Sequence, residues 1–162
     1  RGYVPREIPA TRGTLSAGVI VPVFEKEEKV HVLLTRRSQK LNRHRGEVSF
    51  PGGLLQHGDR DTMAAALREC SEETGLKEED IEIVGRLDDT ITIAGIIITP
   101  YVGVIPFPYG FVTDPDEVAY LIHLPLENVI NEDDSYSMYW ERDYIWGSTY
   151  GILYQLKTLI TA

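Results

Sequence analysis

The chain is poor in cysteine and has no long apolar run. Its one cysteine, Cys70, leaves no internal disulfide possible, which is typical of a reducing compartment. The longest apolar candidate, residues 91–105, is interrupted by Gly95, Pro100 and Gly103, whereas a membrane span needs about 20 apolar residues. We therefore expect a cytoplasmic protein that has no membrane partner.

Basic residues are also scarce. Lys and Arg number 16 against 25 Asp and Glu, giving a net charge of −9, which argues against a nucleic-acid partner. The basic residues are unevenly placed, however. Five of them fall within ten residues that contain no acid, namely Arg36, Arg37, Lys40, Arg43 and Arg45. A local basic cluster on an acidic protein suits a small polyanion.

The 162 residues suit one domain, 1–162, whose first 14 residues form an extended arm. Strands interleaved with two helices predict an α/β fold, with parallel and antiparallel pairs because some connections are short and others hold a helix. We expect strands at 15–24, 30–35, 48–50, 81–87, 95–105 and 117–124, a helical turn at 125–129, a hairpin over 136–146 and a final helix capped by Ser148.

The most informative stretch is a helix that ends at Thr74, capped by Asp61 or Thr62. At about 100° per residue its three acids fall on one arc, near the end where the helix dipole favours cations. A bound divalent cation removes this conflict, because hard cations take carboxylate oxygens. Cys70 lies on the apolar arc, and Gly75 suits the left-handed residue after the helix. The three acids are Glu69, Glu72 and Glu73.

The span from Gly53 to Leu76 resembles the Nudix box of the Nudix hydrolases. Residues 68–76 match the second half of that pattern in full. The first half differs, because Asp59 replaces a Glu and eight residues instead of seven separate it from Arg68. The resemblance implies an α/β/α sandwich around a mixed β-sheet and hydrolysis of a nucleoside diphosphate derivative with Mg²⁺ or Mn²⁺.

Residues before the box are similar to the signature of the coenzyme A pyrophosphatase subfamily. They are the run from Leu33 to Ser38, then His44 and Gly46, then residues 50–53. The subfamily also tends to have the longer box. Asn42 stands where a second Arg is expected, with Arg43 one residue later. The resemblance implies cleavage of coenzyme A or its derivatives to 3′,5′-ADP and 4′-phosphopantetheine, or to acyl-phosphopantetheine.

Roles follow for particular residues. We expect Glu69 and Glu73 to bind the metal ion, with Glu72 next and the backbone carbonyl of Gly52 as a further ligand. Arg68 is expected to orient the carboxylates. Either Glu72 or Glu117 serves as the general base. The residues expected at the substrate phosphates are Arg36, Arg37, Arg43 and His44.

Two other functions stay open at this point. One is a Nudix pyrophosphatase that acts on ADP-ribose or a dinucleotide, which the Asn42 departure leaves open. The other is a non-catalytic Nudix module that binds a nucleotide, although such modules lose the metal-binding acids that this chain keeps. The sequence does not determine the oligomeric state and is compatible with a homodimer.

Overall fold

The computed structural model describes residues 2–133 and 136–162. Its elements alternate between strands and helices along the chain. In order they are β1 (Ser16–Lys26), β2 (Lys29–Arg37), β3 (Val48–Ser49), β4 (Gly52–Leu54), α1 (Thr62–Thr74), η1 (Glu78–Asp80), β5 (Glu82–Arg86), β6 (Thr90–Ile91), β7 (Ile97–Val104), β8 (Val118–Pro125), α2 (Leu126–Ile130), β9 (Ser137–Trp140), β10 (Asp143–Trp146) and α3 (Gly147–Thr161).

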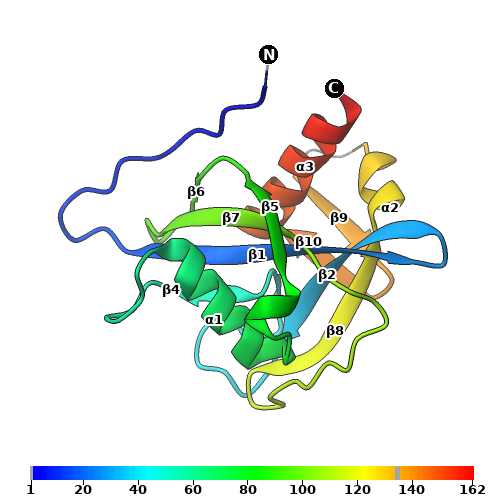
Figure 1. Ribbon diagram of the computed structural model, residues 1–162, viewed down its shortest axis with the longest axis horizontal. Coiled ribbons are helices and arrows are strands. Elements are labelled where there is room, and N and C mark those ends of the chain that lie inside the picture. The colour runs from blue at the N-terminus through cyan, green and yellow to red at the C-terminus, as the bar shows by residue number, and fades with distance from the viewer. Residues whose placement is uncertain (1, 134–135) are drawn as a thin grey trace.

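Eight strands form one mixed sheet with β1 near its middle (Figure 1). The sheet runs in the order β3-β2-β1-β7-β5, while β4, β6 and β8 pair with β1, β7 and β2 respectively. Strands β1 and β7 are parallel, and the other pairs are antiparallel. Strands β9 and β10 form a separate hairpin. The predicted coexistence of parallel and antiparallel pairs is confirmed.

Helices cover both faces of the sheet, because the buried strands are apolar on both sides. Ile20 and Leu33 face α1 and pack with Cys70 in one core cluster. Val21 and Leu34, one residue further along each strand, face α3 in a second cluster. The result is the α/β/α sandwich that the sequence predicted.

The turn between β1 and β2 is tighter than the sequence suggested. The two strands pair as far as Lys26 and Lys29, which leaves Glu27 and Glu28 as a two-residue turn. Both have positive φ, at 53° and 62°. This conformation matches the twist of a hairpin, but it favours Gly or Asn over Glu.

Glu28→Gly is therefore expected to stabilise the protein by about 1 kcal/mol, since it removes the left-handed backbone cost. The midpoint of thermal unfolding should rise by about 2–4 °C. Glu25→Gly is the matched control, because it removes the same charge from an exposed position within the strand. The control should lower stability by about 0.5–1 kcal/mol. Equal shifts in both variants would point to charge rather than to the backbone.

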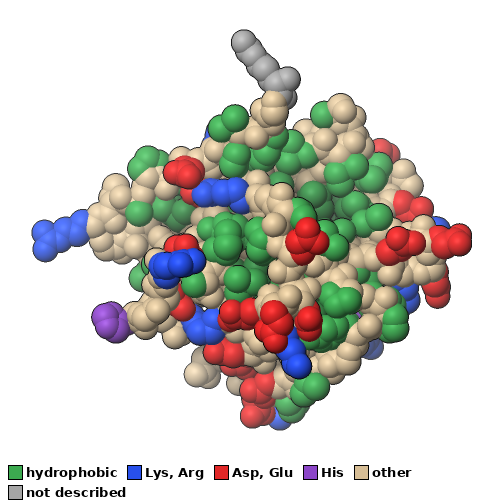
Figure 2. Space-filling model, in the orientation of Figure 1, with side chains coloured by type: hydrophobic (Ala, Val, Ile, Leu, Met, Phe, Trp, Pro, Cys, Tyr) green, Lys and Arg blue, Asp and Glu red, His purple; other side chains and the backbone are tan. Residues whose placement is uncertain are grey.

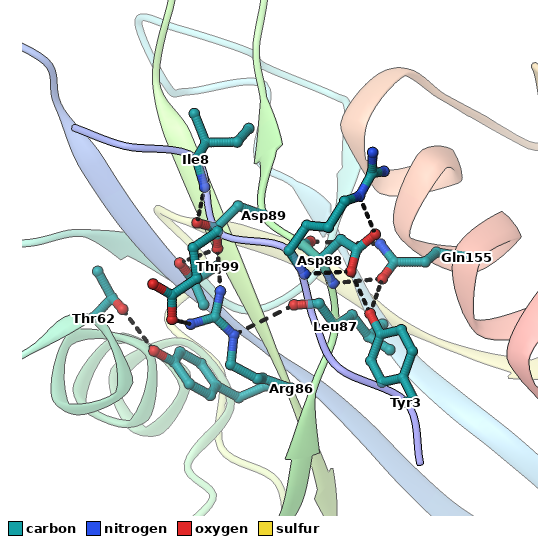
Figure 3. A network of polar contacts seen from close by, with 12 residues as sticks. Tyr3, Ile8, Thr62, Arg86, Leu87, Asp88, Asp89, Thr99 and Gln155 are labelled. Atoms are coloured by element: carbon teal, nitrogen blue, oxygen red, sulfur yellow. Dashed lines mark hydrogen bonds and ion pairs between the residues drawn. The ribbon is translucent and has the colours of Figure 1, made fainter. Parts of the chain in front are cut away.

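The N-terminal arm binds along the loop that follows β5 (Figure 3). The Tyr3 hydroxyl donates to Asp88 Oδ1 at 2.6 Å, and the backbone N–H of Ile8 donates to Asp89 Oδ2 at 2.9 Å. Burial and the neighbouring Asp88 carboxylate raise the pKa of Tyr3 to about 12. Tyr3 also contacts Gln155 of α3 at 3.0 Å. The arm thus joins the sheet to the last helix.

Two sequence-based assignments need correction. Helix α3 begins at Gly147 with Trp146 at its N-cap and no side-chain capping bond, so Ser148 lies inside the helix and does not cap it. The predicted strand over 95–105 is shorter, at Ile97–Val104. Part of the predicted hairpin over 136–146 is confirmed as β9 and β10. Within residues 2–133 and 136–162, no helix is long and apolar enough to span a membrane.

Candidate active site

Helix α1 is fixed at both ends by local chemistry. The Asp61 side chain accepts a hydrogen bond from Ala64 N at 2.8 Å, and Gly75 closes the helix in the left-handed conformation at φ 77°. Cys70 is fully buried, and burial raises the pKa of its thiol to about 12. The helix lies close to β1 because Gly18 has no side chain there. A Cβ on Gly18 would stand 2.0 Å from the carbonyl oxygen of Thr62.

Gly53 brings the β4 backbone against the acidic side of α1, and Gly52 brings it against β1. A Cβ on Gly53 would stand 2.7 Å from Glu69 Cγ and 2.8 Å from Glu69 Cδ. In the pairing with β1, Ile20 N bonds to the Pro51 carbonyl and Leu55 N bonds to Ser16. Backbone groups alternate along an antiparallel strand, so those of Gly52 point away from β1. The Gly52 carbonyl is therefore free to face a ligand.

Carboxylates from two elements line one pocket of about 200 Å³ beside this turn. Glu69 and Glu73 come from α1, and Glu117 comes from the residue before β8. The pocket is also lined by Thr35, Arg37, Leu41, Gly52, Gly53 and Val118. Figure 2 shows acidic side chains gathered on the face that α1 covers in Figure 1.

Glu73 has the most unusual environment of these acids. Its side chain is buried, and burial together with the charges of Glu69 and Glu117 raises its pKa to about 8. Arg37 and a backbone hydrogen bond from Gly52 act in the opposite direction. Burial and neighbouring acids raise the pKa of Glu117 as well. A group of neighbouring acids with a buried member favours a cation, because the cation offsets their mutual repulsion.

Arg68 and Asp59 form a linked pair next to Glu69. Arg68 Nε and Nη2 each donate to a carboxylate oxygen of Asp59 at 2.9 Å, and Nη1 donates to Glu69 Oε1 at 2.8 Å. The Arg68 hydrogen bonds lower the pKa of Asp59 to about 2. Asp59 therefore anchors the residue that holds Glu69. No role was expected for Asp59, although its place in the Nudix box was a signal.

Asp59→Ala is expected to lower turnover by about tenfold to a hundredfold, because Arg68 would lose its two-pronged anchor and Glu69 its fixed orientation. Steady-state kinetics at saturating Mg²⁺ measure this, with Asp61→Ala as the control. That control removes the cap of the same helix, at a cost of about 1 kcal/mol, without touching Arg68. If the two variants lose activity equally, helix stability and not the Asp59 bond to Arg68 explains the loss.

The basic segment is divided between the two faces of the sheet. Arg37 lines the pocket, and its Nε is buried without a hydrogen-bond partner among the described residues. The neighbouring Arg36 points to the other face, where it pairs with Asp143 at 2.8 Å. The structure therefore does not bring Arg36 into the group that the sequence proposed, because successive side chains alternate along a strand.

The other predicted substrate residues lie in the exposed loop after β2. The carbonyl of Arg43 accepts a bond from Arg37 Nη2 at 3.4 Å. His44 has a positive φ of 54°, and its Nδ1 lies 3.1 Å from Glu47 Oε2. Arg37, the last residue of β2, thus connects this loop to the pocket.

Glu72 is exposed at the edge of the site, with Arg68 Nη1 3.6 Å from its carboxylate.

The donor atoms suit a divalent cation, although the side chains are not yet arranged around one. Among the described residues, no three His, Cys, Asp or Glu side chains stand close enough together to hold a metal ion. Arg68 Nη1 donates to Glu69 Oε1, which leaves Glu69 Oε2 as the second oxygen of that carboxylate. Glu69, Glu73 and the Gly52 carbonyl are all oxygen donors at one pocket, which is the ligand type of Mg²⁺ and Mn²⁺.

Comparison with known sequences identifies the family. A profile described as NUDIX domain matches residues 14–137. The chain belongs to the Nudix family. Its Nudix relatives include proteins named uncharacterized Nudix hydrolase NudL. The one from Citrobacter koseri is 34% identical over 158 residues, which cover 89% of this chain and 82% of that protein. The one from Klebsiella pneumoniae is 32% identical over 160 residues, covering 90% and 83%.

Solved Nudix structures share the fold at low sequence identity. A binary complex of a C. elegans Ap4A hydrolase has a TM-score of 0.65 and 18% identity, covering 91% of this chain and 98% of that one. The NUDIX domain of Shewanella oneidensis NrtR, solved with ADP ribose, has a TM-score of 0.66 and 16% identity, covering 93% and 90%. The family profile and the NudL relatives support a Nudix hydrolase.

Proposed function

We propose that this Nudix hydrolase cleaves the pyrophosphate bond of coenzyme A or its derivatives. The observation that carries the proposal is Arg37, which lines the same pocket as Glu69 and Glu73 and whose buried Nε has no hydrogen-bond partner in the described part of the chain. An unpaired buried donor is costly, and a phosphate oxygen satisfies it. Arg37 also belongs to the run from Leu33 to Ser38 that resembles the coenzyme A pyrophosphatase signature.

Different residues of the pocket have different roles in pyrophosphate hydrolysis. A bound Mg²⁺ or Mn²⁺ ion neutralises phosphate charge and lowers the pKa of water. Glu69, Glu73 and the Gly52 carbonyl would hold that ion, and Arg68 orients Glu69. Glu117 lines the same pocket and is the better placed of the two predicted bases to accept a proton from water. Glu72, the other predicted base and third predicted metal ligand, lies at the exposed edge.

The basic loop supports a substrate that has more negative charge than a diphosphate. Arg37 faces the pocket, while Arg43 and His44 lie in the exposed loop beside it. Coenzyme A carries a 3′-phosphate in addition to its diphosphate, and dephospho-coenzyme A lacks that group. The cations of this loop would meet the second anionic group while Arg37 binds the first.

Coenzyme A is expected to give 3′,5′-ADP and 4′-phosphopantetheine, with dephospho-coenzyme A about tenfold to a hundredfold poorer in kcat/KM. Product identification and kinetics on both compounds test this. Arg43→Ala should shrink the difference if Arg43 contacts the 3′-phosphate. Lys29→Ala is the control, because Lys29 is an exposed base at the far end of β2, paired with Glu127. Equal rates for the two compounds in the wild type would contradict a role for the basic loop.

The alternative substrate class is ADP-ribose or a dinucleotide. The fold neighbours include a NUDIX domain solved with ADP ribose and an Ap4A hydrolase, and Asn42 departs from the coenzyme A signature. The same substrate panel separates the classes. If ADP-ribose is cleaved far faster than coenzyme A, the subfamily proposal is wrong. The basic loop after β2 then binds another nucleoside diphosphate derivative.

A further inference from the structure

Strand β8 is paired with β2 on one edge only within the part of the chain that the structure describes. The directions of its backbone groups follow from β2. Arg37 directs its backbone toward β3, since its N–H donates to Glu47 at 2.8 Å and its carbonyl accepts from Gly46 at 3.0 Å. Backbone directions alternate along an antiparallel strand. The β2 residues whose backbone faces β8 are therefore Val32, Leu34 and Arg36.

Their partners on β8 are Leu124, Ile122 and Tyr120. The residues between these partners, Leu121 and His123, consequently direct their N–H and C=O groups away from the sheet. An open strand edge of this kind is a template for an extended chain that carries amides.

A hollow of about 620 Å³ lies along this open edge. Its lining includes four consecutive residues of β8, 120–123. Successive side chains point to opposite faces, so consecutive residues line a hollow together only where it opens onto the strand edge. Along β8 the carboxylate pocket comes first and the hollow second, because Val118 lines the pocket and Tyr120, two residues later, lines the hollow.

The walls of the hollow favour a narrow ligand over a second folded copy of the protein. The β1–β2 turn contributes Lys26 and Glu27, and the β9–β10 turn contributes Glu141 and Arg142. Charged side chains of both turns therefore line the hollow beside the edge. They oppose pairing with a second folded copy at the about 4.8 Å spacing of strands, whereas a single extended chain needs less room.

We propose that the open edge of β8 binds the amide-bearing arm of the substrate as an added strand. The proposal rests on the proposed function, since the pantetheine arm of coenzyme A carries two amides and begins at the diphosphate. With the diphosphate at Arg37 and the carboxylates, the arm leaves the pocket past Val118 and runs along Leu121 and His123. Their N–H and C=O groups then bond to the amides of the arm. These bonds give affinity for the arm whichever acyl group it carries.

Amide hydrogen exchange on the wild-type protein tests this directly. With Mg²⁺ and saturating 4′-phosphopantetheine, exchange at Leu121 and His123 should slow by about tenfold or more, because their N–H groups gain acceptors. Saturating 3′,5′-ADP, which lacks the arm, should leave both rates unchanged. Tyr120 and Ile122 are internal controls, since their N–H groups already face β2.

A variant gives a second readout. Leu121→Pro removes one outward N–H and leaves the inward bonds of β8 intact, as proline permits on an edge strand. It should raise the KM for coenzyme A and the inhibition constant of 4′-phosphopantetheine by about fivefold to tenfold, without changing the inhibition constant of 3′,5′-ADP. Unchanged exchange at Leu121 and His123 in a protein that cleaves coenzyme A would overturn the arm site alone. Failure to cleave coenzyme A would overturn the proposed function as well.

Discussion

Glu73→Gln is expected to abolish nearly all turnover while making the metal-free protein more stable. The carboxylate is a predicted ligand of the metal ion, so the loss of its charge should cost at least about a hundredfold in kcat. In the metal-free folded protein the buried Glu73 has its pKa raised to about 8, so near neutral pH its carboxyl is held protonated, whereas in the unfolded chain it ionises freely. Replacing this carboxyl by a neutral amide should therefore raise the free energy of unfolding by about 1–2 kcal/mol, as is common when a strained active-site group is replaced.

Two further measurements, on other glutamate variants and on the effect of Mg²⁺, test the metal-binding role of Glu73. Glu69→Gln should also lose turnover by orders of magnitude, whereas Glu72→Gln, at the exposed edge, should lose far less. Mg²⁺ should raise the melting temperature of the wild type, because a ligand that binds only the native state stabilises it, and should do little for Glu73→Gln. Full wild-type activity in excess chelator would refute the metal-binding role of these glutamates.

Gly18→Ala is expected to destabilise the protein by about 2–4 kcal/mol. The new methyl group would stand 2.0 Å from the Thr62 carbonyl oxygen and 3.0 Å from Ala66 Cβ, so α1 must move away from β1. Because α1 carries Glu69 and Glu73, activity should fall together with stability.

Gly85→Ala is the matched control for this substitution. Gly85 lies in strand β5, and nothing stands within 4 Å of a Cβ added to it. Chemical denaturation should show this variant within about 1 kcal/mol of the wild type. Comparable losses in both variants would show that glycine content in the sheet, and not contact with the helix, explains the effect.

The fold and helix α1 were largely predictable because their signals are local. The cap at Asp61 and the left-handed Gly75 depend on neighbouring residues, and both are as predicted. The spacing of Gly53 and Glu69 within the Nudix box is local as well, and these two residues are in contact in the structure.

The parts of the site that were missed depend on direction across the sheet. Arg36 and Arg37 are equivalent by composition, but the strand alternation sends Arg36 to Asp143 on the opposite face. Their strand was predicted to end at Thr35, so the alternation was not applied to them; β2 in fact extends to Arg37. The contact of Asp59 with Arg68 and the open edge of β8 required three-dimensional coordinates.

The burial of Cys70 has a consequence for the proposed reaction, whose substrate carries a thiol. Thiol–disulfide exchange needs an accessible thiolate, and the only thiol of this chain is fully buried with a pKa of about 12. Coenzyme A, the proposed substrate, forms mixed disulfides with exposed protein thiols under oxidising conditions. This protein presents no such thiol, so under the proposed function the free and oxidised forms of coenzyme A would not trap it covalently.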